Sequence, residues 1–140
     1  MNGIKLKISR VQDLLYSAGR ARVVVVGDVM LDQFVWGSVS RISPEAPVPI
    51  VDFDHESYMP GGAANVARNL SALRAQTRLF GVAGCDHAGD QMIELLKAQG
   101  VDCGGLLELS GRPTTIKTRI VAGQQQVVRV DREHRHELDP

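Results

Sequence analysis

The stretch Val23-Val24-Val25-Val26-Gly27-Asp28 decides the fold of this chain. Four consecutive β-branched residues are typical of a strand that is buried on both faces in a parallel sheet. In open α/β sheets, ligands bind just beyond the carboxyl ends of such strands. The sequence therefore predicts a buried strand whose end, at Asp28, faces a ligand-binding crevice.

Helix and strand patterns alternate beyond this strand. The run Pro60-Gly61-Gly62-Ala63-Ala64-Asn65 opens a helix whose apolar residues recur at helical spacing over 66–73. A strand over 77–83 follows, and then a second helix with apolar residues over 92–96. Alternation at this spacing predicts right-handed crossovers in a mostly parallel sheet with helices on its faces.

Capping residues mark the expected helix ends. Ser9 is expected to cap a short amphipathic helix in front of the first strand, and Gly19 stands where the end of that helix favours positive φ. Asp86 or His87 is expected to cap the later helix, which ends at Gly100. We interpret the first of these helices as a packing element without a site.

Further strands predict a small accessory sheet. Two of them are expected over 34–39 and 48–54, separated by a segment over 41–47 in which two prolines prevent regular pairing. The segments 114–122 and 126–131 are expected to form a hairpin.

Composition limits the classes of function. The chain has 140 residues, 44% of them apolar, so we expect residues 1–140 to belong to one α/β domain. Sixteen basic residues balance sixteen acidic ones, which argues against attraction to nucleic acid or to an anionic membrane. The apolar stretches are too short to span a bilayer, and the amino terminus lacks a signal-peptide block, so a cytoplasmic location is expected. Cys85 and Cys103 show neither metal-ligand spacing nor a disulfide framework, and are expected to be free.

The run Gly61-Gly62-Ala63-Ala64-Asn65 is the most informative candidate site. Paired glycines permit close approach of a ligand, and free amides at a helix start point towards its oxygens. Asn65 adds a side-chain donor and acceptor in the same turn. The alternative is a glycine turn in front of a packing helix, with Asn65 merely solvated.

Two carboxylates follow the first strand. Asp32 is suited to accept hydrogen bonds from sugar hydroxyls, because a carboxylate offers only acceptors and forms strong charge-assisted bonds. The alternative for Asp28 and Asp32 is a turn-forming or capping role. The glycine repeat of a dinucleotide fingerprint is missing after this strand, which argues against a Rossmann oxidoreductase.

The expected hairpin carries a cationic face. Strict alternation places Lys117 and Arg119 on one side, and Arg129 and Asp131 share one side of the second strand. Such a face could clamp a substrate phosphate, although a solvated outer face is the alternative. The two histidines in the run 132–137 suggest a metal site, but the interleaved charges favour a solvated linker, and no metal is expected.

Taken together, Gly27-Asp28-Val29-Met30-Leu31-Asp32 and Gly61-Gly62-Ala63-Ala64-Asn65 resemble the motifs of the ribokinase-like carbohydrate kinase family. Within that family, Ser40-Arg41-Ile42-Ser43-Pro44-Glu45-Ala46-Pro47-Val48-Pro49 is similar to the kinases that phosphorylate the anomeric oxygen of D-glycero-D-manno-heptose 7-phosphate. The resemblance extends from about Ala21 to the end of the chain.

The resemblance implies a ribokinase-like, doubly wound, mostly parallel α/β sheet with a small β-sheet lid over the sugar, here from about 34–54 and 114–131. It implies MgATP as phosphoryl donor, a sugar phosphate as substrate, heptose supply for lipopolysaccharide core, and homodimers that pair through their lids. The substrate-binding residues that it implies are Asp32, Gly61, Gly62 and Asn65, followed by the weaker candidates Lys117, Arg129 and Asp131.

One element of the family pattern is missing. Members carry a glycine-rich element that ends in the aspartate acting as catalytic base, and none occurs before Pro140. No residue of this sequence is therefore assigned as the base, most of the ATP and Mg²⁺ ligands are expected elsewhere, and we expect the chain alone to be inactive. The alternatives are a kinase of another sugar and a non-catalytic sugar-binding or dimerisation module.

Overall fold

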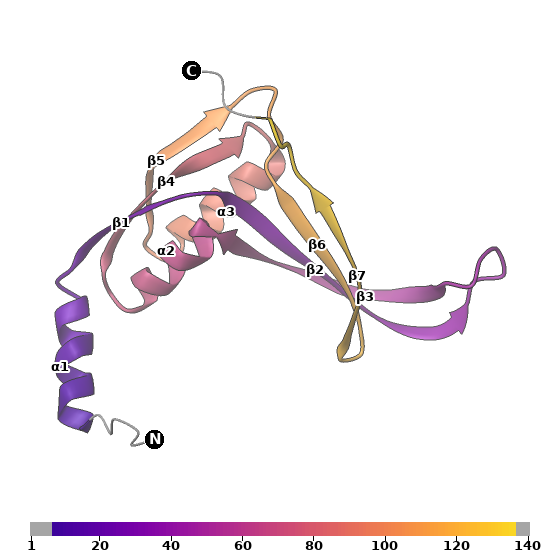
Figure 1. Cartoon of the computed structure of the whole chain (residues 1–140), viewed down its shortest axis with the longest axis horizontal. Coiled ribbons are helices and arrows are strands. Elements are labelled where there is room, and N and C mark those ends of the chain that lie inside the picture. Colours follow the sequence, from indigo (N-terminus) through magenta and orange to yellow (C-terminus); the bar gives the residue numbers. More distant parts are fainter. Residues whose placement is uncertain (1–6, 137–140) are drawn as a thin grey trace.

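The computed structural model describes residues 7–136, which form two sheets and three helices (Figure 1). In chain order the elements are α1 (Ile8–Ala18), β1 (Arg22–Val26), β2 (Val29–Ile42), β3 (Pro49–Gly62), α2 (Ala63–Ala72), β4 (Gln76–Gly84), α3 (His87–Lys97), β5 (Asp102–Leu109), β6 (Ile116–Ala122) and β7 (Gln125–Arg132). A three-stranded sheet in the order β1-β4-β5, here called sheet A, forms the body of the molecule. A four-stranded sheet in the order β3-β2-β6-β7, called sheet B, extends from it. The predicted α/β class, with a parallel sheet and a second small sheet, is confirmed.

Sheet A is parallel, as the alternation of helices and strands predicts. β1 pairs with β4 and β4 with β5, and the chain returns through α2 and α3 between them. Val25, Leu79, Met92 and Leu96 belong to one buried cluster that also includes Ala64 of α2. Because both helices share this cluster with the strands, they cover the same face of sheet A.

The other face of sheet A is exposed, so the predicted burial of β1 on both faces is wrong. Val24 is 61% exposed and Val26 75%, whereas Val25 is buried. Alternate residues of a strand point to opposite faces, and within residues 7–136 the helices cover only one of them. Phe80 and Leu107 lie exposed on the neighbouring strands.

Helix α1 differs from its predicted boundaries. It begins at Ile8 behind Lys7, so Ser9 lies inside the helix and does not cap it. Gly19 has φ −64° and not a positive φ, because the helix closes through a right-handed turn in which the Gly19 amide donates to the Leu15 carbonyl. The helix buries none of its residues and stands beside the body (Figure 1).

Sheet B is built on the long antiparallel ribbon of β2 and β3. β2 contains the predicted segment 34–39, and β3 contains the predicted segment 48–54 except for Val48. Both strands extend further than predicted, so Pro60-Gly61-Gly62 ends β3 and the helix begins only at Ala63. β6 joins β2 in parallel, and the predicted hairpin of β6 and β7 turns at Gly123, which has φ 60°. The far part of the β2–β3 ribbon reaches well beyond β6 and β7 (Figure 1).

A hydrogen-bonded junction connects the body to sheet B. Asp86 caps α3 by accepting from the Gly89 amide at 2.9 Å, which confirms its predicted role, and it also accepts from the Thr114 amide at 2.8 Å. The Thr114 hydroxyl is buried and accepts from the Gly84 amide at 2.9 Å. Burial favours the neutral carboxyl, but the hydrogen bonds from Thr114 and Gly89 outweigh it and lower the pKa of Asp86. The start of β6 is thereby fixed to the end of β4.

Candidate sugar-binding site

One row of residues crosses sheet B at the end nearer the body. Asp32 on β2 lies opposite Met59 of β3 and, on its other side, opposite Lys117 of β6. Lys117 in turn lies opposite Asp131 of β7. Strand pairing thus brings together three of the predicted site residues that are far apart in the sequence.

Gly61 lies directly against the Asp32 carboxylate. A Cβ atom built on Gly61 would stand 2.5 Å from Asp32 Oδ2 and 2.8 Å from Met30 Cγ. Both distances are shorter than real Cβ atoms show, so a side chain here would have to displace the carboxylate. A residue without a side chain is therefore required for Asp32 to lie in this position.

Gly62 and Asn65 lie at the start of helix α2, beside Gly61 and Asp32. Gly62 has φ 59°, and a Cβ atom on it would stand 2.5 Å from the Asp28 carbonyl oxygen, which accepts the Ala63 amide at 2.8 Å. The strand end at Asp28 and the helix start are thus joined through backbone contact. Asn65 lies half-buried in the first turn, and its side chain forms no hydrogen bond within residues 7–136. Asn65 is therefore available to a ligand.

Arg119 is the residue that the sequence-based selection of site residues missed. Its Nη1 donates to Asp32 Oδ1 at 2.7 Å, with 23% of the arginine side chain and 18% of the aspartate side chain exposed. Its guanidinium carbon lies 5.2 Å from the centre of the Phe34 ring. The alternation of side chains along the strand places Arg119 on the predicted cationic face. Its contact with Asp32 depends on the pairing of β6 with β2, and no local sequence pattern indicates that pairing.

The predicted cationic face is balanced by carboxylates. Asp131 accepts from Lys117 Nζ at 3.1 Å and from Arg129 Nε at 2.8 Å and Nη2 at 3.1 Å. The hydrogen bond from Lys117, and then that from Arg129, holds the pKa of Asp131 below its usual value. Glu133 lies 3.6 Å from Lys117, and its pKa is lowered mainly by Arg135. An anionic ligand at this face must therefore compete with Asp131 for both cations.

An aromatic strip continues from the site along the ribbon. The Phe34 and Trp36 rings stack with centres 5.9 Å apart, and Trp36 stacks in the same way on His55 of β3. Trp36 Nε1 donates to the Ser57 hydroxyl at 3.1 Å, which fixes the indole on the sheet. The strip begins at the ring that lies under Arg119.

A cleft of about 580 Å³ adjoins the row at the carboxyl end of β1. Asp28 lines it, as the position after a parallel strand predicts, together with Arg112 and Lys117. The Arg112 guanidinium donates to the carbonyls of His136 at 2.9 Å and His134 at 3.1 Å, so it holds this segment at the cleft. Lys117 lines the cleft and also lies opposite Asp32 in the row, so the two regions meet at this residue.

Residues 7–136 contain no group of three potential metal ligands among His, Cys, Asp and Glu. His134 and His136 pack edge to face with ring centres 4.7 Å apart. Among the helices described here, none is long and apolar enough to cross a membrane.

Comparison of the sequence with known protein families identifies relatives of this chain. A model described as pfkB family carbohydrate kinase matches residues 20–140. A bifunctional protein HldE from Magnetococcus marinus is 51% identical over 111 residues, which are 79% of this chain and 23% of that protein. The protein of the same name from Geobacter sulfurreducens is 45% identical over 130 residues, or 93% of this chain and 26% of that protein. The chain thus spans about a quarter of the length of these curated relatives.

Solved structures share the fold. A ribokinase from Arabidopsis thaliana, determined with ribose and ATP, superposes with a TM-score of 0.64 at 21% identity, covering 79% of this chain and 35% of that one. A carbohydrate kinase from Agrobacterium tumefaciens gives a TM-score of 0.64 at 22% identity, covering 80% of this chain and 35% of that one. The predicted ribokinase-like fold is confirmed.

Proposed function

Because this chain belongs to the pfkB family of carbohydrate kinases, we propose that it forms the sugar-binding part of a kinase for D-glycero-D-manno-heptose 7-phosphate. The observation that supports this most is the contact between the Asp32 carboxylate and Gly61 beside the start of helix α2. The resemblance of the run 40–49 to heptose phosphate kinases supports the choice of sugar. The reaction is transfer of a phosphoryl group from ATP to O1 of the sugar.

Each residue of this group has a distinct part in recognition. Asp32 accepts hydrogen bonds from sugar hydroxyls, and its charge strengthens them. Gly61 leaves room for the Asp32 carboxylate beside the backbone, and Gly62 leaves room for the Asp28 carbonyl where the chain turns into helix α2. Asn65 adds a donor and an acceptor from the helix start. Together these residues are proposed to recognise the arrangement of hydroxyls along one edge of the sugar.

Lys117 of β6 and Arg129 of β7 are proposed to hold the substrate phosphate. Lys117 and Arg129 already share Asp131 as their counter-ion, so a phosphate of higher charge would take the place of that carboxylate. Asp131 then keeps both cations in position when the sugar phosphate is absent.

We assign no catalytic base and no nucleotide or metal ligand within this chain. The sequence lacks the glycine-rich turn that ends in the catalytic aspartate of the family. The role proposed for Asp32, Gly61, Gly62 and Asn65 is to bind and orient the sugar for phosphoryl transfer. We expect the isolated chain to transfer no phosphoryl group from MgATP to heptose 7-phosphate above background.

A panel of sugars tests the choice of substrate. The assay measures kcat/KM of the complete kinase that carries this chain with heptose 7-phosphate, ribose, fructose and fructose 6-phosphate. Heptose 7-phosphate is expected to give the highest value. A higher kcat/KM with any other sugar would show that the kinase assignment holds for a different substrate.

Sheet B is also proposed to pair with a second copy. The far part of the β2–β3 ribbon exposes Val39, Ile42 and Phe53, by 42%, 61% and 65% respectively. A two-stranded ribbon with exposed apolar side chains is marginally stable alone, so a partner would cover it. Sedimentation at micromolar concentration is expected to show a dimer, and Phe53→Ser is expected to shift it towards monomer. A wild-type protein that sediments only as monomer would contradict this pairing.

A further inference from the structure

The two oxygens of the Asp32 carboxylate have different surroundings. Oδ1 accepts from Arg119 Nη1 at 2.7 Å. Oδ2 is the oxygen that lies against Gly61, where a Cβ atom would approach it to 2.5 Å. One oxygen therefore accepts a hydrogen bond from a guanidinium, while the other lies against the Gly61 backbone in the proposed sugar site.

Arg119 is itself held in place by an aromatic support. Its guanidinium carbon lies 5.2 Å from the centre of the Phe34 ring, and Phe34 stacks on Trp36. Trp36 is fixed in turn by its hydrogen bond to Ser57. A planar guanidinium can stack and pair at the same time, whereas an ammonium offers only a point charge. The support therefore favours arginine over lysine at this position.

We propose that Arg119 is a positioning residue, which binds Asp32 Oδ1 and so presents Oδ2 to one sugar hydroxyl. This inference rests on the proposed function, because it assigns to Arg119 an effect that passes through Asp32. Arg119 sets the rotation of the carboxylate about its side-chain bonds, and thereby the direction from which a hydroxyl can be accepted. The residue contributes to selection of the sugar without contacting it.

A double-mutant cycle in the complete kinase tests this role. The variants are Asp32→Asn, Arg119→Met and the two combined, with KM for heptose 7-phosphate, KM for ATP and kcat measured for each. Arg119→Met is expected to raise KM for the sugar phosphate about tenfold, as expected for weakening one charge-assisted hydrogen bond. KM for ATP is expected to stay within about twofold, because nothing in the proposed role touches the nucleotide. In the Asp32→Asn background the same change is expected to add less than about twofold.

Matched controls separate positioning from folding. Arg78→Met removes an arginine that also pairs with an aspartate and lies over a phenylalanine, but on sheet A, and it is expected to leave sugar kinetics unchanged. Arg119→Lys keeps the charge and is expected to recover part of the affinity. If thermal unfolding shows that Arg119→Met does not fold, the cycle is run with Arg119→Lys, whose effect must also vanish beside Asp32→Asn.

The outcomes distinguish this inference from the proposed function. Effects of Asp32→Asn and Arg119→Met that multiply in full would overturn it, since Arg119 would then act independently, for example on the substrate phosphate. A wild-type KM in Arg119→Met would overturn it as well. A wild-type KM in Asp32→Asn would instead overturn the sugar site itself.

Discussion

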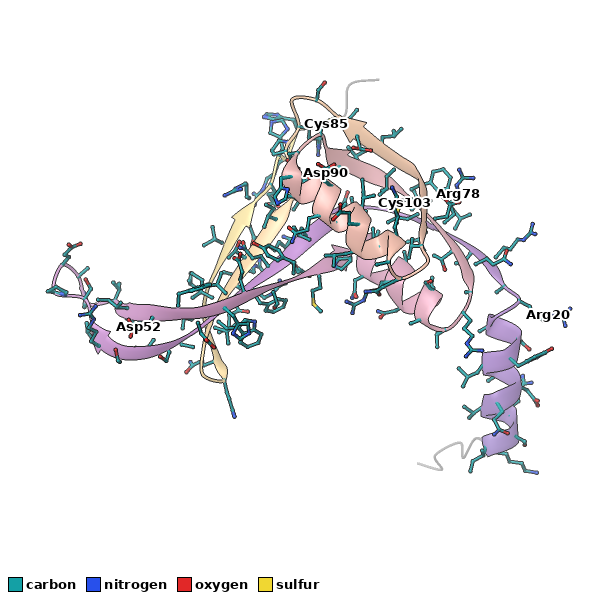
Figure 2. The ribbon with its side chains drawn as sticks, turned by 180° about the vertical axis from the view of Figure 1, so that it is seen from behind. Arg20, Asp52, Arg78, Cys85, Asp90 and Cys103 are labelled. Atoms are coloured by element: carbon teal, nitrogen blue, oxygen red, sulfur yellow. The ribbon has the colours of Figure 1, made fainter. Side chains whose placement is uncertain are left out.

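Sheets A and B each carry an arginine that pairs with an aspartate and lies over a phenylalanine ring. On sheet A, Arg78 Nε lies 3.3 Å from an oxygen of Asp102, and its guanidinium carbon lies 5.4 Å from the centre of the Phe80 ring. The side chains of this pair are 52% and 57% exposed. Arg78 lies on the body, away from the β2–β3 ribbon (Figure 2). Water competes for such a pair, and its contribution to stability is expected to be small.

On sheet B the same three residue types are more deeply enclosed. Arg119 and Asp32 approach to 2.7 Å, and their side chains are 23% and 18% exposed. The residue types and the ring distances are nearly the same, so the difference lies in burial and in the neighbours. A half-buried carboxylate with one oxygen bonded to an arginine is restricted in its orientation, and recognition of a sugar requires a defined orientation.

The glycines beside the two pairs show the same contrast. A Cβ atom on Gly61 would stand 2.5 Å from Asp32 Oδ2, whereas one on Gly104 would stand 3.1 Å from Asp102 Oδ1 and 3.3 Å from Arg78 Nη2. The neighbours of Gly104 are exposed side-chain ends that can move by a few tenths of an ångström. The neighbours of Gly61 are held by strand pairing and by Arg119.

The largest expected effect follows from changing the two aspartates. Asp32→Asn in the complete kinase replaces an acceptor oxygen with a donor amide, and we expect kcat/KM for heptose 7-phosphate to fall roughly tenfold to a hundredfold. KM for ATP at saturating sugar is expected to move much less. Asp102→Asn is the control and is expected to leave both values unchanged. Equal losses of kcat/KM in the two variants would mean that the aspartate of sheet B has no special role in sugar recognition compared with that of sheet A.

The motifs from which the sequence selects Asp32 and Gly61 are local, and the structure places the two residues against each other. Arg119 could not be selected in the same way, because its contact with Asp32 spans 87 positions and depends on which strand β6 joins. The prediction that β1 is buried on both faces was wrong for a related reason. A β-branched run predicts a strand, but it does not indicate whether helices cover one face of the sheet or both. Val24 is 61% exposed because α2 and α3 lie on one face only.

The junction at Asp86 tests whether the two sheets unfold together. Asp86→Ala removes the helix cap and the acceptor of the Thr114 amide, at an expected cost of about 2 kcal/mol in the free energy of unfolding. Trp36 is the single tryptophan and lies in sheet B, so its fluorescence during urea unfolding reports on the sheet that Asp86 anchors. Asp90→Ala, in the first turn of the same helix, is the control and is expected to cost less than about 1 kcal/mol.

The effect of Asp86 has a defined pH dependence. Its pKa is lower in the folded protein than the usual value of 3.8, so the stabilisation is fully present above that value and is lost as the pH falls through the folded pKa. The difference between wild type and Asp86→Ala should therefore be constant near neutral pH and shrink below about pH 4. A difference that grew on acidification would contradict a lowered pKa.

The next smaller effect concerns the glycines. Gly61→Ala forces the carboxylate of Asp32 to move, and we expect a loss of about 1–2 kcal/mol in the free energy of unfolding together with weaker sugar binding. Gly104→Ala is expected to change stability by less than about 0.5 kcal/mol, because its neighbours are exposed and can yield. Urea unfolding and titration with heptose 7-phosphate measure the two effects. A crystal structure of Gly61→Ala with Asp32 unmoved would show that the close contact does not fix the carboxylate.

The smallest expected effect is that of the exposed pair on sheet A. Arg78→Met is expected to lower the free energy of unfolding by less than about 1 kcal/mol, because water screens the pair and the methionine can still pack on Phe80. That small loss should shrink further in about 1 M salt, where the screening length falls to roughly 3 Å. Arg119→Met is expected to cost more and to depend less on salt, since it leaves a largely buried carboxylate without its partner. Urea unfolding of both variants at low and high salt measures the contrast. Equal losses with equal salt dependence would mean that burial does not distinguish the two pairs, and the fixed orientation of Asp32 would then need another cause.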